Sequence, residues 1–418
     1  MLRNFTLLIS LSVCLCLQAK EQIIVVNEGN WGSDNGRLSY FEDGKMVSNK
    51  WFQDANGTKL GDNPTDIIQV NENLLAVAVN GSNLVQLIDT EGKALGEIEI
   101  ANCRCLTTDG TYIYVTSFAH QVTLGDGLTE SFEKGFVARI DPEFNQVTAA
   151  VEVGAEPDGI AYYDGHLFVA NSGAYTDFDS TMSVIDVETM EVVRTIDTGQ
   201  KNLGGDLSIS GQYICVASPG DYYIVEPATI ILDCKAATEG TSDSDCYVLL
   251  KIAGTYNTKA FDGSFYLIGS TFSYSTYDYV YNFNTVDPAA VLESKGKEGV
   301  SDSLPGNISA GIKKMTAPYG IYVNPYTGYI YATDAANYTN SGKLYQWTPE
   351  GMNQQTFTTY INPAKLLALN PNGSDGVENI ETEYTSDNST IYNLQGIPVS
   401  NPIPGQIYIS KGKKFIYK

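Results

Sequence analysis

The sequence is poor in basic residues, and this shortage excludes two classes of partner. Its 418 residues include 25 lysines and arginines against 49 aspartates and glutamates, a formal net charge of −24. The densest basic segment is Lys-Gly-Lys-Lys at residues 411–414. Because phosphate groups are bound through clusters of Lys and Arg, we expect neither nucleic acid nor an anionic membrane surface as a partner.

Histidine is scarcer still, which limits the catalytic chemistry available. Only His120 and His166 are present. His166 follows an Asp-Gly turn at the start of a strand and is interpreted as structural. His120 lies on a loop, and no nucleophile motif accompanies it. The sequence therefore favours a binding protein over an enzyme and leaves the second class open.

Long hydrophobic runs are also missing. The apolar stretch over residues 5–17 is too short to cross a bilayer, and no other stretch could do so. It follows Arg3 and precedes Ala19, which is the pattern of a signal peptide over residues 1–19. Cys14 and Cys16 do not follow the residues typical of lipoprotein signals, so lipidation is not expected. We predict an exported protein of the cell surface, the periplasm or the extracellular space.

Cysteine is sparse, with five residues beyond the signal peptide. Cys234 and Cys246 flank one predicted hairpin loop, and export leads us to expect a disulfide between them. Cys103 and Cys105 have a poor spacing for zinc, and Cys215 lies among apolar residues. We interpret these three as buried free thiols, and the sequence does not define any pairing among them.

What the chain does contain is a repeat that occurs seven times. Each copy has a short hydrophobic strand, a polar break, a second strand and an acidic hairpin, most clearly over residues 159–196. Four-stranded repeats of about 40–50 residues are the signature of propeller blades, and seven copies in register disfavour an ordinary β-sandwich. The second strands cover residues 23–26, 74–79, 112–116, 167–170, 213–217, 265–269 and 329–333. We predict an all-β, seven-bladed β-propeller over residues 20–369.

The first copy lacks an innermost strand. Residues 361–369 repeat the blade-opening pattern of residues 156–160, so we expect this C-terminal strand to complete the N-terminal blade. Such closure pairs strand edges that would otherwise be open. A cut near residue 360 should therefore destabilise the whole ring.

A smaller module follows the ring. Residues 370–389 are polar, acidic and rich in turn formers, as in a linker, and residues 390–418 return to a β pattern. Tyr-Asn-Leu-Gln-Gly at 392–396 and Gly-Gln-Ile-Tyr-Ile at 405–409 resemble the C-terminal sorting modules of Bacteroidetes proteins. This resemblance implies an extracytoplasmic address reached by type IX secretion.

The ring itself resembles a known family. Phe-Val-Ala-Asn at residues 168–171 stands where the YVTN family has its Tyr-Val-Thr-Asn signature, and Ser-Val-Ile-Asp at 183–186 also matches. The chain is therefore similar to the YVTN-type seven-bladed propellers of surface layers and the periplasm. That family is defined by its fold, so the resemblance implies architecture and location but no chemistry.

In a propeller, the loop into each first strand and the loop between the second and third strands open on one face, which we call the loop-rich face. Here these loops combine aromatic rings with amide, hydroxyl and carboxylate groups, which suits a small molecule, a glycan or a protein. The candidate ligand-binding residues are Asn27, Glu28, Trp31, Asn80, His120, Asn171, Tyr175, Asp221, Tyr222, Tyr274, Asp334 and Tyr338. The alternative is that the polar residues merely end strands and that the tyrosines cover neighbouring loops.

The leading hypothesis is an exported, non-enzymatic, monomeric propeller of the cell envelope that binds a ligand or partner on this face without a cofactor. Calcium is the one metal we consider, because carboxylates could meet at the centre of the ring, as in calcium-dependent propeller lactonases and lyases. These are Glu28, Asp62, Glu156, Asp206, Asp221 and Asp334. A calcium-dependent hydrolase or lyase is therefore one alternative. A corrinoid-capture protein and a surface-layer scaffold are the others.

Overall fold

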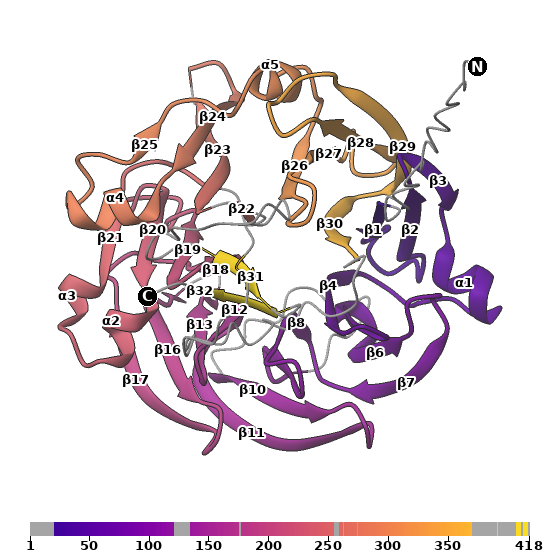
Figure 1. The fold of residues 1–418 in the computed structure, drawn as a ribbon, viewed down its shortest axis with the longest axis horizontal. Coiled ribbons are helices and arrows are strands. Elements are labelled where there is room, and N and C mark those ends of the chain that lie inside the picture. Colours follow the sequence, from indigo (N-terminus) through magenta and orange to yellow (C-terminus); the bar gives the residue numbers. More distant parts are fainter. Residues whose placement is uncertain are drawn as a thin grey trace, which may run out of the picture.

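The predicted ring is confirmed by the computed structural model. The structure describes residues 21–120, 134–174, 177–254, 259–261, 263–273, 275–369, 391, 407–410 and 413–416. Seven four-stranded antiparallel sheets are arranged radially around a common centre (Figure 1). The predicted signal peptide and linker lie outside the described residues. In the part of the chain that the structure describes, no helix is long and apolar enough to span a membrane.

Each blade contains four strands that follow one another along the chain, except that blade 1 takes its innermost strand from the far end of the ring and blade 4 is interrupted by a small hairpin. From the innermost strand outward, blade 1 contains β30 (Pro363–Ala368), β1 (Gln22–Asn27), β2 (Arg37–Glu42) and β3 (Lys45–Ser48). Blade 2 contains β4 (Pro64–Asn71), β5 (Leu74–Val79), β6 (Leu84–Ile88) and β7 (Ala94–Glu99). Blade 3 contains β8 (Cys103–Thr108), β9 (Ile113–Ser117), β10 (Lys134–Asp141) and β11 (Gln146–Ala155).

The remaining four blades follow the same plan. Blade 4 contains β12 (Pro157–Tyr163), β13 (His166–Asn171), β16 (Thr181–Asp186) and β17 (Glu191–Asp197), and it carries a small hairpin of β14 (Gly173–Ala174) and β15 (Asp177–Phe178). Blade 5 contains β18 (Gly204–Ser210), β19 (Tyr213–Ser218), β20 (Ala228–Asp233) and β21 (Tyr247–Leu250). Blade 6 contains β22 (Lys259–Phe261), β23 (Ser264–Ser273), β24 (Asp278–Val286) and β25 (Val300–Ser301). Blade 7 contains β26 (Pro318–Val323), β27 (Ile330–Asp334), β28 (Ser341–Trp347) and β29 (Gln355–Ile361).

Short helices and one hairpin complete the described elements. The helices are α1 (Trp51–Asn56), η1 (Asn80–Ser82), α2 (Cys234–Thr238), α3 (Asp243–Cys246), α4 (Pro288–Glu293) and α5 (Ile308–Ile312). Beyond the ring, β31 (Ile407–Ser410) pairs with β32 (Lys413–Ile416) in an antiparallel hairpin.

The second strand of each blade is largely apolar because neighbouring blades cover both of its sides, and β5 is apolar at every position. In β5, Leu75 and Val77 pack into a cluster with residues of blade 1, including Ile24. Ala76 and Ala78 point the other way and join a cluster with residues of blade 3. Successive side chains of a strand point to opposite sides of the sheet. Because both sides are buried here, the usual alternation of apolar and polar residues is absent. The core of the ring is therefore divided among the contacts between blades.

The predicted closure of the ring is also confirmed. Strand β30 pairs antiparallel with β1, with Leu366 opposite Val25 and Leu367 opposite Ile24. All six residues of β30 are buried. The last strand of the ring thus supplies the innermost strand of its first blade.

The predicted disulfide between Cys234 and Cys246 is corrected by the structure, in which both are buried free thiols. The segment between them is not a plain hairpin loop, because it folds into α2 and α3. The Cys246 thiol donates instead to the carbonyl oxygens of Thr241 (3.4 Å) and Ser242 (3.2 Å). The interpretation of Cys103, Cys105 and Cys215 as buried free thiols is confirmed.

Candidate functional site

The polar residues that end the second strands form hydrogen bonds within their own blades and to neighbouring blades. The Asn27 side chain is fully buried, where its Nδ2 donates to Ser39 Oγ (3.0 Å) and its Oδ1 accepts from Thr359 Oγ1 (2.8 Å). Asn171 is also fully buried, and its Nδ2 donates to Thr181 Oγ1 at 3.0 Å and to Ser183 Oγ at 3.1 Å. Asn171 thus bonds within its own blade, whereas Asn27 also joins blade 1 to Thr359 on β29 of blade 7.

Asn80 and Asp334 also bond to the scaffold, Asn80 across two blades and Asp334 within its own. Asn80 Nδ2 donates to the Cys103 carbonyl oxygen (2.9 Å), which joins blades 2 and 3. The Asp334 carboxylate accepts from the backbone N–H groups of Thr316 (3.0 Å) and Ala317 (2.8 Å) at the entrance to β26. With 2 % and 4 % of their surface exposed, these residues are not available to a ligand. Asn27, Asn80, Asn171 and Asp334 therefore belong to the scaffold.

Exposed apolar side chains crowd the loop-rich face. Of the predicted residues, Trp31, Tyr222 and Tyr338 are strongly exposed, whereas Tyr175 and Tyr274 lie outside the residues whose side chains the structure describes. Other exposed residues of this face were not among the predicted ones. We call the whole set the aromatic arc; it comprises Trp31, Tyr222, Tyr223, Ile224, Tyr277, Tyr279, Val280 and Tyr338.

The blade 5 part of the arc is held in a rigid loop. One oxygen of Asp221, Oδ1, accepts from the N–H groups of Tyr223 (3.0 Å), Ile224 (2.7 Å) and Val225 (2.8 Å). These bonds lower the pKa of Asp221, with the bond from Ile224 contributing most. The Tyr222 ring packs edge-on against Phe178, with 5.8 Å between the ring centroids. Asp221 therefore organises the loop that presents its exposed neighbours.

Three tyrosines of the arc have a strained backbone. Tyr222, Tyr277 and Tyr338 adopt left-handed conformations with φ of 63°, 54° and 62°. Such values are rare for bulky residues and cost free energy, so they persist where the surroundings impose them. All three lie in loops between second and third strands, in the consecutive blades 5, 6 and 7. In each case the strained conformation accompanies an exposed aromatic ring on the loop-rich face.

Beneath the arc, a charged cluster crosses the centre of the ring. Lys365 on β30 is 5 % exposed, and its Nζ lies 3.0 Å from Asp206 Oδ2 and 3.5 Å from Asp66 Oδ1. Burial lowers the pKa of Lys365, but the two carboxylates outweigh burial and the pKa rises overall. Arg104 Nε lies 3.0 Å from Asp158 Oδ1 on the next blade. These five residues form what we call the central cluster.

Two glutamates lie nearer the loop-rich face than the central cluster. Glu28 accepts a hydrogen bond of 2.7 Å from the Tyr319 hydroxyl, and burial raises its pKa. Glu156 stands directly before β12 and is 9 % exposed. Burial raises the pKa of Glu156 to about 7, and the nearby Arg104 only partly opposes this rise.

The six carboxylates that could have met at the centre of the ring are not brought together. Asp62 accepts instead from the N–H groups of Gly32 (2.8 Å) and Asp34 (3.1 Å), within the loops of blades 1 and 2. Asp221 and Asp334 bind backbone of their own blades, as described above. Across the described ranges, no three His, Cys, Asp or Glu side chains are arranged to hold a metal ion.

His120 lies beside the loop that enters β8. Its Nε2 is 3.3 Å from Asn102 Nδ2, and its ring is tilted against Phe118. The Phe118 ring is in turn 5.0 Å from the guanidinium carbon of Arg104. His120 thus neighbours the central cluster through Phe118, while the segment that follows it lies outside the described residues.

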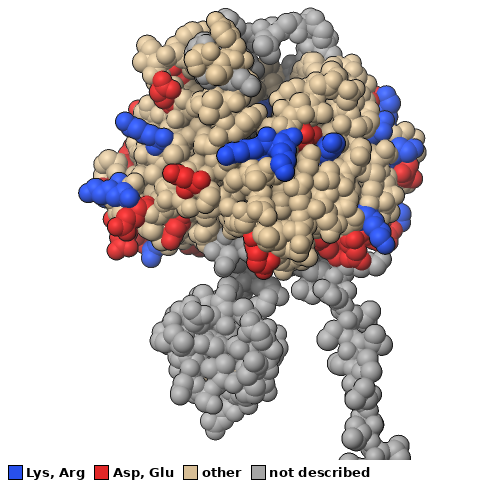
Figure 2. All heavy atoms as spheres, turned by 90° about the horizontal axis from the view of Figure 1, so that it is seen from above, with Lys and Arg blue, Asp and Glu red and all other residues tan. Residues whose placement is uncertain are grey.

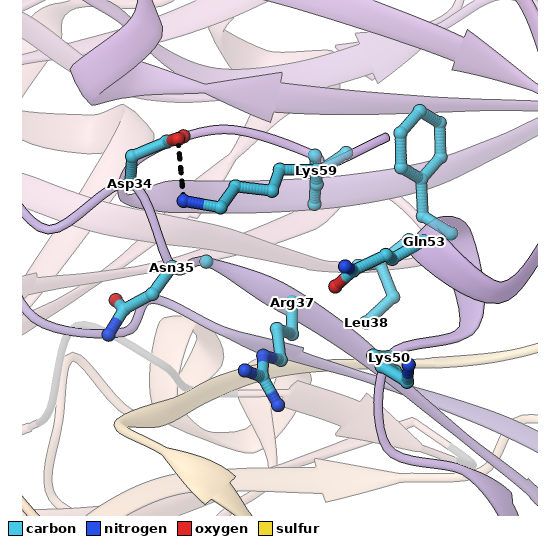
Figure 3. A pocket seen from close by; sticks show the side chains of 10 residues that line it. Asp34, Asn35, Arg37, Leu38, Lys50, Gln53 and Lys59 are labelled. Atoms are coloured by element: carbon cyan, nitrogen blue, oxygen red, sulfur yellow. Dashed lines mark hydrogen bonds and ion pairs between the residues drawn. The ribbon is translucent and has the colours of Figure 1, made fainter. Parts of the chain in front are cut away.

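A shallow pocket lies at the edge of the ring, between β2 and α1 (Figure 3). Lys59 at its rim is paired with Asp34 at 3.0 Å, and Lys50 is paired with Asp54 at 3.1 Å. The Arg37 guanidinium stacks over the Tyr360 ring at 3.8 Å. Figure 2 shows the ring from the side, with both signs of charge in small groups separated by uncharged surface. The edge of the ring therefore does not present a continuous basic surface.

Comparison with known proteins shows the fold class to which this chain belongs. No family model matches the chain, and no curated protein does. Hydrazine synthase from Kuenenia stuttgartiensis aligns over 72 % of this chain and 96 % of its own, with 15 % identity and a TM-score of 0.50. A quinonprotein alcohol dehydrogenase-like protein from Bacteroides thetaiotaomicron aligns over 84 % of this chain and 79 % of its own, with 12 % identity and a TM-score of 0.52. These similarities place the chain among β-propellers and extend to the fold alone.

Proposed function

We propose that this protein is an exported, non-enzymatic β-propeller of the cell envelope that binds a macromolecular or small-molecule partner through its aromatic arc. The observation that carries the proposal is the position of the exposed apolar residues. Tyr223, Ile224 and Tyr277, with 91 %, 86 % and 81 % of their surface exposed, are the most exposed large apolar residues in the described part of the chain. All three lie on the loop-rich face.

An exposed apolar surface of this kind is unfavourable unless something covers it. Contiguous apolar patches on soluble proteins usually mark interaction sites. Tyr and Trp are the residues enriched at binding hot spots, because they combine a large rigid ring with a polar edge. The Asp221 bonds fix the loop before binding, which reduces the entropy lost when a partner docks. The arc therefore has the composition of an interface, and its blade 5 loop is already fixed by backbone hydrogen bonds.

The non-enzymatic part of the proposal is supported by how the polar residues are used. The candidate carboxylates mostly bind backbone or lysine within the ring instead of converging on a shared point. Export rests on the signal-like residues 1–19 and on the resemblance of residues 392–409 to sorting modules. The envelope location rests on these features and on the resemblance to YVTN-type propellers.

Site-specific photo-crosslinking in the producing cell tests the partner directly. A photoreactive residue at position 223 should yield a defined crosslinked product. The control is position 144, because Phe144 is also exposed (63 %) but lies in the turn between β10 and β11 on the opposite face. Equal labelling at both positions, or none at position 223, would contradict the proposal. With the purified partner, Tyr223→Ala should weaken binding by at least about tenfold if Tyr223 is a hot spot.

A further inference from the structure

Trp347 carries a buried hydrogen-bond donor that the fold does not use. Its side chain is fully buried at the end of β28, where it packs in one apolar cluster with Ile308 and Ile312 of α5. The indole Nε1, which can only donate, has no hydrogen-bond partner among the described residues. A buried indole N–H usually has an acceptor, because an unpaired buried donor costs free energy. Trp347 therefore marks a place where an added acceptor would be stabilising.

The Trp347 indole forms part of the wall of a pocket at the rim of the ring. This pocket lies between α5, which Figure 1 shows at the rim, and the turn that follows β28. Its volume of about 310 Å³ is at the lower end of the range for small-molecule sites. The turn between β28 and β29 opens on the face opposite the loop-rich face, so the pocket is separate from the aromatic arc. Its lining includes Asn307, Gly311, Lys314, Trp347, Asn353 and Gln354.

The edge of the indole that carries Nε1 faces this pocket. A Cβ atom at Gly311 would lie 2.7 Å from Trp347 Cζ2, 3.4 Å from Trp347 Cε2 and 2.8 Å from Gln354 Oε1. Nε1 is bonded to Cε2, so the edge that bears the donor is turned toward two residues of the lining. Glycine at position 311 keeps this edge free of a side chain. The Gln354 side chain lies over the same edge, and because it is exposed it can move aside when a ligand enters.

The charge of the pocket favours an anion. Of the described residues that line it, none is Asp or Glu, although the chain has 49 acidic residues against 25 basic ones. Lys314 is an exposed residue of the lining and forms no ion pair with any described residue. The amide groups of Asn307 and Asn353 can also donate to an oxygen ligand. The pocket thus combines a buried donor, a cation without a partner and further amide donors.

We propose that this pocket binds a carboxylate, with Trp347 Nε1 donating to one of its oxygens and the Lys314 ammonium paired with its charge. An ionised carboxylate is an acceptor only, and it forms stronger hydrogen bonds than a neutral acceptor does. Stacking of a sugar or an aromatic ligand is disfavoured, because the Trp347 ring lies in the core, nearly parallel to Tyr345 at 18°. Phosphate is less suited, because its recognition favours arginine, and the described lining has none.

The carboxylate comes either from a small organic acid or from an Asp or Glu side chain of a partner. Both sources present the same planar group to Trp347 and Lys314, so the two are distinguished by the probe that binds. This site lies outside the aromatic arc and adds a second binding activity to the proposed function.

The indole N–H signals in a nuclear magnetic resonance spectrum report the donor directly. The chain has three tryptophans, so isotope-labelled protein gives three such signals, which Trp31→Phe and Trp51→Phe assign. Butyrate and a Gly-Glu-Gly peptide with blocked ends are titrated at pH 7 and constant ionic strength, and butyramide is the neutral control. We expect the Trp347 signal alone to shift saturably with at least one carboxylate, and no signal to shift with butyramide.

The same titration identifies the source of the carboxylate. A shift with butyrate indicates a small organic acid, whereas a shift with the peptide alone indicates a side chain of a partner. Absence of a saturable shift of the Trp347 signal with both carboxylates overturns the proposal. An equal shift with butyramide does so as well, because the site would then not recognise charge.

Lys314→Gln tests the cation, with Lys313→Gln as the matched control. Lys313 is also exposed and is the preceding residue, but its Nζ lies over the Phe283 ring at 5.6 Å and it does not line the pocket. The first variant should bind the carboxylate at least about tenfold more weakly, and the second should bind as the wild type does. Equal affinities in the two variants overturn the proposal. Neither result affects crosslinking at position 223, so the two proposals fail separately.

Discussion

Lys365 lies 3.0 Å from Asp206, although the two residues belong to blades that are not neighbours in the ring. Lys365 is on β30 of blade 1, and Asp206 is on β18 of blade 5. Asp66 on blade 2 completes the contact at 3.5 Å. A single side chain from the closing strand therefore connects three blades at the centre. Ring closure thus depends on a buried ion pair as well as on strand pairing.

Removal of this cation should be strongly destabilising. In Lys365→Met, Asp206 and Asp66 would remain buried without their cation, and breaking a buried pair from one side costs about 3–5 kcal/mol. Urea unfolding at pH 7 measures the change. Lys295→Met is the control, because Lys295 forms an exposed pair with Asp245, and exposed pairs contribute only about 0–1 kcal/mol. Equal losses in the two variants would show that burial of the pair is unimportant.

Deletion of the closing strand should open the ring. A chain ending at residue 361 lacks β30, so β1 keeps β2 but loses its partner at the centre of the ring and the buried apolar surface of Leu366 and Leu367. We expect this variant to lose cooperative unfolding, measured by circular dichroism on heating. A chain ending at residue 370 keeps β30 and should unfold as the full chain does. A cooperative transition in the shorter chain would contradict the role of closure.

Replacement of Glu156 should change how stability depends on pH. The folded protein holds the Glu156 proton up to about pH 7, whereas an ordinary glutamate releases it near pH 4.5, so stability falls as the pH rises across this window. Glu156→Gln removes this loss and should be more stable than wild type by about 1–3 kcal/mol at pH 8. Urea unfolding at pH 4.5 and 8 should show that the difference in free energy of unfolding between Glu156→Gln and the wild type becomes smaller at the lower pH. A difference that does not change with pH would indicate another cause.

Loss of Asp221 should loosen the blade 5 loop without unfolding the ring. Asp221→Ala removes the acceptor of three backbone N–H groups, at Tyr223, Ile224 and Val225. Hydrogen exchange of these amides should become faster, while exchange in β19 and β20 stays unchanged. Partner crosslinking from position 223 should decrease in the same variant. Unchanged exchange at the three amides would show that the loop is held by other contacts.

The thiols offer a check on the corrected disulfide. In a preparation of residues 20–418 without reductant, the five buried cysteines should not react with Ellman's reagent while the protein is folded. Burial raises the pKa of Cys103 to about 12, which suppresses its thiolate further. In denaturant, five thiols per chain should react. A count of three thiols per chain in denaturant would show that one disulfide is present.

The ring could be predicted from the sequence because every second strand leaves the same pattern, as in the apolar run Leu74–Val79. Closure was predictable for the same reason, since β30 repeats the blade-opening pattern. The roles of Asn27 and Asn171 were not predictable, because an amide that ends a strand can point into the blade or into solvent. The Lys365–Asp206 pair depends on contacts about 160 residues apart, which no local pattern records.

Closure through β30 also sets the order in which the protein can be completed. The N-terminal blade is the first to be synthesised, yet it receives its innermost strand only after residue 368 has been made. Pairing between chain ends this far apart is a late and slow step in folding. Until then, β1 has an open edge at the centre of an unfinished ring. The finished propeller is thus a post-translational product, and a ribosome-bound chain cannot yet possess the loop-rich face as a whole.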